Sequence, residues 1–293
     1  MTKAYAALLT QQCEWIILNT KTHKLPIWTY ESGTRSRRRD VLGVEEPLEL
    51  RVLAGGERRT LGVTMRTPGA DFELAAGFAL SEGIVTELDQ IEGLSYCVDR
   101  RLCEEQNFNI VNIWLRAAKL PDLDTVERRF SAGSACGICG TASLDALERR
   151  AYTSLPPGPQ LSPELLCKLP EQLRQAQGIF DVTGGLHAAA LFDLNGQLLA
   201  LREDIGRHNA LDKVLGWALL QSKLPLHNAI VLLSGRASYE LLQKSLVAGV
   251  PVVCAISAPS SLAVAMARRF GITLVGFLRG ERFNVYAGDE RLR

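Results

Sequence analysis

The segment from Ala229 to Leu278 reads AIVLLSGRASYELLQKSLVAGVPVVCAISAPSSLAVAMARRFGITLVGFL, and its pattern decides the fold class. Three short apolar runs, 229–234, 251–257 and 272–278, alternate with two segments that have apolar residues at helical spacing. Strands and helices that alternate in this way form parallel sheets with right-handed crossovers. The sequence therefore predicts an α/β fold in which the loops after the strands meet at one sheet edge, where such sheets bind ligands.

The region before this unit predicts a hairpin followed by a helix. Residues 189–204, AALFDLNGQLLALRED, contain two strand-like runs around Asn195-Gly196, a pair that favours tight turns. The next segment, 209–220, has the apolar spacing of a helix.

The N-terminal half predicts a hairpin, a helix and a further strand. Residues 48–56 alternate like a strand up to a Gly-Gly turn, and 59–65 supply the partner strand. Residues 108–117 are expected to form another strand. A helix is expected over 71–80, because this run has apolar residues at helical spacing. Its expected boundary residues are Thr67 as the cap, Pro68 in the first turn and Gly83 at the end.

The chain is expected to divide into two lobes preceded by an arm. Residues 1–33 are interpreted as an irregular N-terminal arm, 34–150 as an N-terminal lobe, and 151–293 as a C-terminal α/β lobe. Residues 154–166 are rich in Pro and Ser and are interpreted as a linker or long loop between the lobes. The arm ends in a basic cluster of Arg35, Arg37, Arg38 and Arg39. We interpret this cluster as a solvated tail rather than as a docking segment for an acidic partner.

The composition indicates an ordinary globular protein. The chain has 293 residues, of which 47% are hydrophobic and 22% charged, so it can bury a full core. A net charge of +1 produces no global field for nucleic acid, and no apolar run approaches the roughly 20 residues of a membrane helix. Glu14 interrupts the apolar N-terminal stretch, and no small-residue cleavage site follows. The sequence therefore predicts a cytoplasmic protein that binds neither nucleic acid nor membrane.

The clearest chemical motif is a cysteine pair in SAGSACGICGTASLDALERR, residues 131–150. The seven cysteines are odd in number and too sparse for a disulfide scaffold, so the pair Cys136 and Cys139 points to thiol chemistry. A helix is expected to begin just after Cys139, and its N-terminus stabilises a thiolate, which is the reactive form of cysteine.

Three other readings of the cysteine pair remain. Two cysteines with this spacing can cycle as a redox disulfide or form a buried inert pair. They can also bind zinc, which requires further ligands such as Cys97, Cys103 or His187. No second CxxC or HxxxH pair is present, so no permanently bound metal is predicted.

The three loops that follow the C-terminal strands are predicted to bind phosphate. They are SGRAS at 234–238, SAPSS at 257–261 and FLRGER at 277–282. Ser and Gly leave backbone N–H groups accessible to an anion, and Arg side chains pair with phosphates. Each loop is weak evidence alone, but together they indicate a phosphate-bearing ligand. The candidate residues are Gly235, Arg236, Ser257, Arg279 and Arg282.

Two further motifs contain histidines whose role stays open. In REDIGRHNALDK, Asp204, His208 and Asp212 are four residues apart and are expected to share one helical face. A general acid or base and a helix start held by charged side chains at a lobe interface are both compatible with this spacing. In TGGLH, residues 183–187, the glycines permit a tight turn, and His187 is interpreted as a packing residue.

Several of these motifs together resemble the FdhD family, the accessory sulfurtransferases of formate dehydrogenase. The resemblance covers roughly Val41 to Tyr286. It rests on VEEPLELRV, VTMRTPGADFELAAGFALSEGI, CGICG, TGGLHAAAL, REDIGRHNALDKVLGWAL, SGRASYELLQKSLVAGVPVVCAISAPSSLAVA and GITLVGFLRGERFNVY. It implies a fold similar to cytidine deaminases and a homodimer. It also implies that the protein accepts sulfur from a cysteine desulfurase and passes it to the molybdenum cofactor, bis-molybdopterin guanine dinucleotide, which formate dehydrogenase needs for activity.

The resemblance also assigns residues. The persulfide-forming cysteine of the family corresponds to Cys136, with Cys139 as the second position of the motif; charge and spacing alone leave the two thiols equivalent. The cofactor-binding segment of the family corresponds to Phe277, Leu278, Arg279, Gly280, Glu281 and Arg282. The cofactor is thereby expected as bound cargo.

Two rival functions follow from the same features. One is a chaperone that holds the molybdenum cofactor without sulfur chemistry, and the other is a thiol-disulfide oxidoreductase. The second is disfavoured because the sequence around CGICG has no thioredoxin-like β-α-β pattern. Neither rival accounts as well for a reactive cysteine pair together with phosphate loops.

Overall fold

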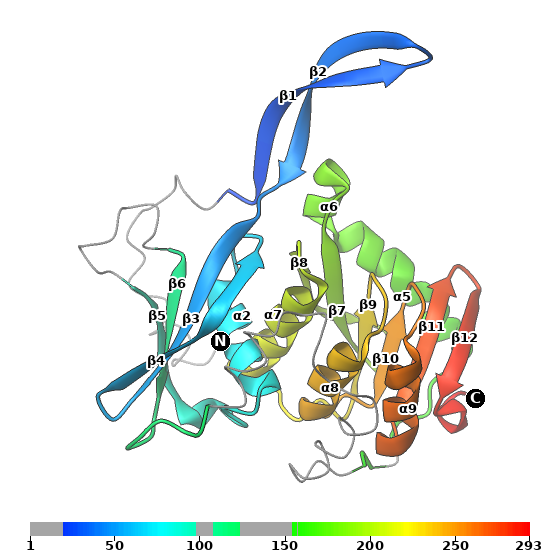
Figure 1. The fold of residues 1–293 in the computed structure, drawn as a ribbon. Coiled ribbons are helices and arrows are strands. Elements are labelled where there is room, and N and C mark those ends of the chain that lie inside the picture. Colours follow the sequence, from blue (N-terminus) through cyan, green and yellow to red (C-terminus); the bar gives the residue numbers. More distant parts are fainter. Residues whose placement is uncertain (1–19, 98–107, 124–153, 157) are drawn as a thin grey trace.

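The computed structural model of the chain describes residues 20–97, 108–123, 154–156 and 158–293. It contains three β-sheets with helices packed between and against them (Figure 1). The mixed α/β architecture is confirmed, whereas the likeness to cytidine deaminases stays a prediction. Cys136, Cys139 and the expected lobe boundary at 150/151 lie outside the described residues.

The largest sheet has six strands in the order β12-β11-β10-β9-β7-β8. Its parallel core and the connecting helices are β9 (Ala229–Leu233), α8 (Tyr239–Val247), β10 (Val252–Ala255), α9 (Ser261–Phe270) and β11 (Thr273–Arg279). Every residue of β9 and β10 is buried, which explains why these strands are continuously apolar in sequence. The predicted parallel order is confirmed, and the three strands end at one edge of the sheet.

Antiparallel strands complete this sheet on both sides. They are β7 (His187–Asp193), β8 (Leu198–Asp204) and β12 (Arg282–Ala287). The hairpin β7–β8 turns at Asn195-Gly196 as predicted, with Gly196 at a φ of 77°. Strand β12 was not predicted. It pairs with β11 because Gly280, at a φ of 54°, allows the chain to reverse within the FLRGER segment.

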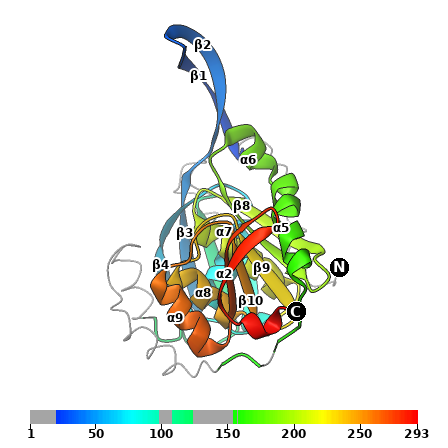
Figure 2. The ribbon, with the colours of Figure 1, turned by 90° about the vertical axis from the view of Figure 1, so that its right-hand side faces the viewer.

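Helices cover both faces of the six-stranded sheet (Figure 2). α7 (Arg207–Leu220), α8 and α9 lie on one face, and α5 (Pro163–Ala176) lies on the other. α5 occupies part of the expected linker at 154–166, so the linker prediction is wrong from Pro163 onward. The helix starts there because Ser162 Oγ accepts a hydrogen bond from Leu165 N at 3.2 Å and Pro163 fits the first turn.

A smaller sheet in the N-terminal half has the strand order β4-β3-β6-β5. Its elements and the adjacent helix are β3 (Glu46–Ala54), β4 (Glu57–Arg66), α2 (Asp71–Ser81), β5 (Ile91–Tyr96) and β6 (Ile110–Leu115). The predicted hairpin, helix and further strand are confirmed. The predicted cap of α2 is wrong, because Ala70 holds the cap position and makes no side-chain cap bond.

The N-terminal arm is also ordered differently from the prediction. β1 (Thr22–Glu31) and β2 (Thr34–Gly43) form a two-stranded hairpin that projects from the body (Figure 1). Ser32 and Gly33 have φ values of 49° and 80°, which suit a tight hairpin turn. The prediction that residues 1–33 form an irregular arm is therefore wrong from Thr22 onward. Backbone pairing with β2 makes this segment a strand, and the sequence pattern of the arm did not indicate that pairing. The remaining short helices are α6 (Gly178–Thr183), η1 (Leu88–Gln90) and η3 (Asp289–Arg291).

Two glycines allow α2 of the smaller sheet to pack directly on α7 of the larger one. A methyl group on Gly77 would come within 1.8 Å of Asp212 O, and one on Gly216 within 1.8 Å of Glu73 O. The helix backbones therefore touch, and one hydrophobic core runs through both sheets. No helix within the described ranges is long and apolar enough to cross a bilayer.

Buried charges reinforce this contact. Asp204, at the end of β8, is 0% exposed and lies 2.7 Å from Lys213 Nζ of α7. The same carboxylate accepts hydrogen bonds from the N–H groups of Thr67 at 3.1 Å and Gly206 at 2.8 Å. Lys213 also donates to Thr67 O at 2.8 Å. Burial lowers the pKa of Lys213, and the neighbouring Asp204 opposes that shift. Asp204, Lys213 and Thr67 thus join the two halves of the chain.

Gly216→Ala is expected to destabilise the protein by about 1–3 kcal/mol or more, because the added methyl group would meet backbone atoms that pack rigidly. Chemical denaturation measures the free energy of unfolding. Gly178→Ala is the matched control, since nothing lies within 4 Å of its added methyl group. Equal stability of the two variants would contradict the close approach of α2 and α7.

Asp204→Ala is expected to cost about 3–5 kcal/mol, because it leaves Lys213 charged and buried without its partner. The double variant Asp204→Ala/Lys213→Met should recover part of this loss, since it removes the orphaned charge. Asp89→Ala, at an exposed carboxylate, is the control and should change the free energy of unfolding by less than about 0.5 kcal/mol. A double variant that is no more stable than Asp204→Ala would argue against the pair.

Candidate functional site

The three phosphate loops predicted from the sequence do meet at the edge where β9, β10 and β11 end. Ser257 N donates to Gly235 O at 3.3 Å, which joins the first and second loops. Phe277 N donates to Ser257 O at 3.2 Å, which joins the second loop to the end of β11. Arg279 Nε donates to Ile256 O at 3.1 Å. The adjacency of the loops is therefore confirmed, while their ligand stays a prediction.

The FLRGER segment differs in form from the predicted loop. β11 continues to Arg279 and β12 begins at Arg282, so Gly280 and Glu281 form the turn of a hairpin. Leu278 is fully buried among apolar residues, and its side chain belongs to the core. The side chains at this hairpin that face solvent are those of Phe277, Arg279, Glu281 and Arg282.

Phe277 has an unusual backbone. Its φ is 54°, in the left-handed region that an aromatic residue rarely adopts, and the strand register shifts at this point. Its side chain is 39% exposed. Backbone strain of this kind costs on the order of 1–3 kcal/mol and is concentrated at functional sites. Burial therefore does not explain the conformation, which coincides with the shift in strand register before Arg279.

Residues of the TGGLH and REDIGRHN motifs lie at the same edge. His187 begins β7, and a methyl group on Gly235 would come within 3.3 Å of His187 Nδ1. Burial lowers the pKa of His187, and the positive charges of Arg207, His208 and Arg236 lower it further. His187 is therefore a neutral imidazole at pH 7 within a positively charged environment.

The predicted stacking of Asp204, His208 and Asp212 on one helical face is wrong. α7 begins only at Arg207, so Asp204 belongs to β8 and forms the buried pair with Lys213. Asp212 is also buried, and burial raises its pKa while the charge of Lys244 at 2.8 Å opposes the shift. The carboxylates of Asp204 and Asp212 therefore stabilise the interface between the two halves of the chain. This agrees with one of the two interpretations of REDIGRHNALDK, a helix start held by charged side chains.

His208 pairs with a residue that the sequence did not indicate. Its Nε2 lies 2.7 Å from Glu240 Oε2 of α8, and the hydrogen bond from His208 lowers the pKa of Glu240. The sequence analysis also did not single out Arg207, although this residue lies directly before His208 in the REDIGRHNALDK motif. Only its position at the start of α7, where its positive charge acts on His187, distinguishes it from an ordinary surface arginine.

The cysteine site itself, Cys136 and Cys139, lies outside the described residues, and so does Cys103. The other zinc ligands considered lie in different sheets. Cys97 follows β5 and its Sγ is 3.8 Å from Arg51 Nη1, whereas His187 lies against Gly235. No group of three His, Cys, Asp or Glu side chains suited to a metal ion occurs in the part of the chain that the structure describes.

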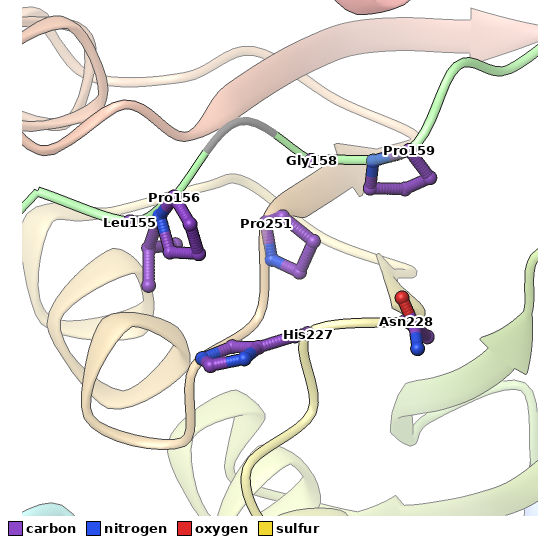
Figure 3. A pocket seen from close by; sticks show the side chains of 7 residues that line it. All are labelled: Leu155, Pro156, Gly158, Pro159, His227, Asn228 and Pro251. Atoms are coloured by element: carbon purple, nitrogen blue, oxygen red, sulfur yellow. The ribbon is translucent and has the colours of Figure 1, made fainter.

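A small pocket lies at the opposite end of the sheet from the phosphate loops (Figure 3). His227, Asn228 and Pro251 line it just before β9 and β10 begin, and Leu155 and Pro159 close the other side. Proline and leucine dominate this lining, and His227 is its ionisable residue. The pocket therefore lacks the charged groups that a phosphate-bearing ligand needs.

Comparison with known proteins identifies relatives over nearly the whole chain. A protein of Streptomyces avermitilis named sulfur carrier protein FdhD is 49% identical, over 92% of this chain and 95% of the relative. A protein of the same name from Mycobacterium tuberculosis is 48% identical, over 87% of this chain and 92% of the relative.

A solved structure shares the fold. A protein described as a formate dehydrogenase accessory protein, from Desulfotalea psychrophila, superposes with a TM-score of 0.72 and 24% identity. The match covers 94% of this chain and all of that one. The model of the FdhD/NarQ family matches residues 44–293, a range that includes both the cysteine pair and the three loops. The chain therefore belongs to the FdhD/NarQ family.

Proposed function

We propose that this protein is a cytoplasmic sulfur carrier that takes sulfur from a cysteine desulfurase and delivers it to a molybdenum cofactor. The cofactor is bis-molybdopterin guanine dinucleotide, bound as cargo before it enters formate dehydrogenase. The observation that carries the proposal is the family match over 44–293, which spans the cysteine pair and the phosphate loops together. The name of the relatives, sulfur carrier protein FdhD, supports the same role.

Cys136 accepts the sulfur in this proposal. Its thiolate attacks the outer sulfur of a donor cysteine persulfide, and the bond between the two donor sulfurs breaks. The donor leaves as a thiolate, and Cys136 carries the persulfide, with no net oxidation or reduction. The helix expected after Cys139 favours the thiolate form of both cysteines.

Cys139 releases the sulfur. Its thiolate attacks the inner sulfur of the Cys136 persulfide, so a disulfide forms between the two cysteines and the outer sulfur leaves as hydrosulfide, which passes to the bound cofactor. The two cysteine sulfurs, oxidised to the disulfide, supply the two electrons that reduce the outer sulfur. A cellular thiol reductant then restores the pair. The protein thereby acts as a sulfurtransferase, and it works as a homodimer in this proposal.

The cargo is bound at the edge where β9, β10 and β11 end. Arg236, Arg279 and Arg282 offset phosphate charge, and the exposed ring of Phe277 stacks on a guanine base. Loops joined by backbone hydrogen bonds provide a preorganised edge for this purpose. Such an arrangement suits a ligand with phosphates and a planar base at the same end.

Incubation of the protein with a cysteine desulfurase and cysteine should add one sulfur atom, which intact-protein mass spectrometry detects. Cys136→Ala should abolish this gain, because it removes the acceptor. Cys139→Ala should retain the sulfur but fail to release it as hydrosulfide. Cys167→Ala, at a cysteine on α5, is the control and should behave as wild type. Maturation of formate dehydrogenase by Cys136→Ala would instead favour the cofactor-holding chaperone.

Phe277→Gly should weaken binding of guanosine diphosphate by about tenfold, since base–aromatic stacking contributes about 1–3 kcal/mol. The free energy of unfolding should stay within about 1 kcal/mol of wild type, because glycine adopts this φ without strain. Isothermal titration calorimetry and chemical denaturation measure the two quantities. Unchanged affinity would exclude Phe277 as the surface on which the base stacks.

A further inference from the structure

The β1–β2 hairpin has two faces of different chemical character. Directly opposed residues of an antiparallel pair share one face, and successive residues of a strand alternate between the faces. The register pairs Trp28 with Arg37 and Tyr30 with Arg35, so these rings and arginines lie on one face. We call it the aromatic-basic face, and its aromatic and charged members are Lys24, Trp28, Tyr30, Arg35, Arg37 and Arg39.

The charges of the hairpin are divided unequally between these faces. The aromatic-basic face carries four basic side chains and no carboxylate. Both acidic residues of the hairpin, Glu31 and Asp40, fall on the opposite face together with Arg38. The strand register therefore sorts the basic cluster at 35–39, which appears in the sequence as one run. One face of the hairpin is strongly positive, and the other is slightly negative.

Two large aromatic side chains are exposed on the positive face. Trp28 is 54% exposed and Tyr30 69%, and Arg35 Cζ lies 3.7 Å from the centre of the Trp28 ring. This cation–π contact orders both side chains in advance, which reduces the entropy lost when a partner binds. Trp, Tyr and Arg are enriched among the residues that dominate protein interfaces, and arginine pairs with carboxylates in a bidentate geometry. The face therefore suits an acidic surface of a partner protein.

The hairpin stands apart from the core of the protein. It forms a sheet of its own and projects from the body (Figure 1). A two-stranded hairpin is marginally stable by itself and leaves both strand edges open. The family model begins at residue 44, directly after β2 ends, so the hairpin lies outside the residues that this model matches. Its position is therefore that of an element that contacts another molecule.

A protein partner fits this surface better than a nucleic acid does. The hairpin holds five basic and two acidic residues, whereas the whole chain has a net charge of +1, so the rest of the chain is net negative. A ribbon inserted into a nucleic-acid groove would have phosphates on both sides, and its second face would bring Glu31 and Asp40 close to them. A protein surface covers one face and can match its charge.

We propose that the aromatic-basic face docks on an acidic surface of formate dehydrogenase, the enzyme that receives the cargo. The choice of this enzyme rests on the proposed function. At the base of the hairpin, a methyl group on Gly43 would come within 3.0 Å of Leu186. Leu186 directly precedes β7, whose first residue, His187, lies beside Gly235. The hairpin therefore projects from the end of the sheet at which the cargo is proposed to bind, and it holds the docked enzyme at that end.

The test is biolayer interferometry of the full chain against purified formate dehydrogenase that lacks its cofactor, at physiological salt. Trp28→Ala and Arg37→Glu should each weaken binding at least tenfold, because they remove an aromatic anchor and reverse a paired charge. Arg38→Glu is the matched control, since it makes the same charge change at an exposed residue of the opposite face. It should bind within about threefold of wild type, because charges outside the contact are screened.

Wild-type affinity of Trp28→Ala and Arg37→Glu would overturn the docking proposal, and so would an equal loss for Arg38→Glu, which would reduce the effect to overall charge. A change from dimer to monomer in Trp28→Ala, measured by light scattering, would assign the face to a second copy of the chain and overturn the proposal. Tighter binding of a single-stranded oligonucleotide than of the enzyme, lost in the same two variants, would overturn it in favour of a nucleic acid.

Sulfur loading of Cys136, measured in parallel by mass spectrometry, separates docking from the proposed function. Trp28→Ala and Arg37→Glu should load sulfur as wild type does, because the hairpin takes no part in that step. Normal loading together with docking that these variants leave unchanged overturns the docking proposal alone. Docking that depends on Trp28 and Arg37, in a wild-type protein that gains no sulfur, overturns the sulfur carrier alone.

Discussion

The rest of the structure depends on the buried pair of Asp204 and Lys213. Both charges are withdrawn from water, so each is tolerable only while the other is present. Thr67 adds three hydrogen bonds to Asp204, Lys213 and Ile205, and it belongs to the segment between the smaller sheet and α2. The pair therefore fixes the end of β8 and the start of α7 against the N-terminal half. It holds in place the turn from which Arg207 and His208 extend.

The contact of α2 with α7 extends this constraint into the core. Gly77 and Gly216 bring the helix backbones together. The carboxylate of Asp212 accepts hydrogen bonds from Ser81 Oγ of α2 at 2.7 Å and from Lys244 Nζ of α8 at 2.8 Å. Because these contacts cross between the sheets, the two sheets share one core and leave little room for independent motion. Rigid support of this kind is what a binding edge made of loops requires.

The binding edge combines rigid and strained parts. Backbone hydrogen bonds join the loops after β9 and β10 to the end of β11, so the three segments hold fixed positions relative to one another. Phe277 remains in a left-handed conformation there, and the side chains of Arg279, Glu281 and Arg282 are exposed at the same hairpin. In the proposed function, this edge holds the cargo while a separate cysteine loop supplies sulfur. Binding and sulfur transfer are then tasks of different segments, which explains why both motifs occur in one chain.

The amino-acid sequence by itself determined the parallel β-α-β-α-β unit, the hairpins at residues 48–65 and 189–204, and the adjacency of the three loops. These features follow from local periodicity and from the handedness of crossovers, so they need no knowledge of distant contacts. The cysteine pair was likewise evident from spacing. Only the tertiary structure decided that Asp204 is a core ion, that residues 22–43 form a hairpin, and that His187 lies beside Gly235. Each of these depends on partners far away in sequence, and a single residue type does not reveal whether its charge will be paired, buried or left for a ligand.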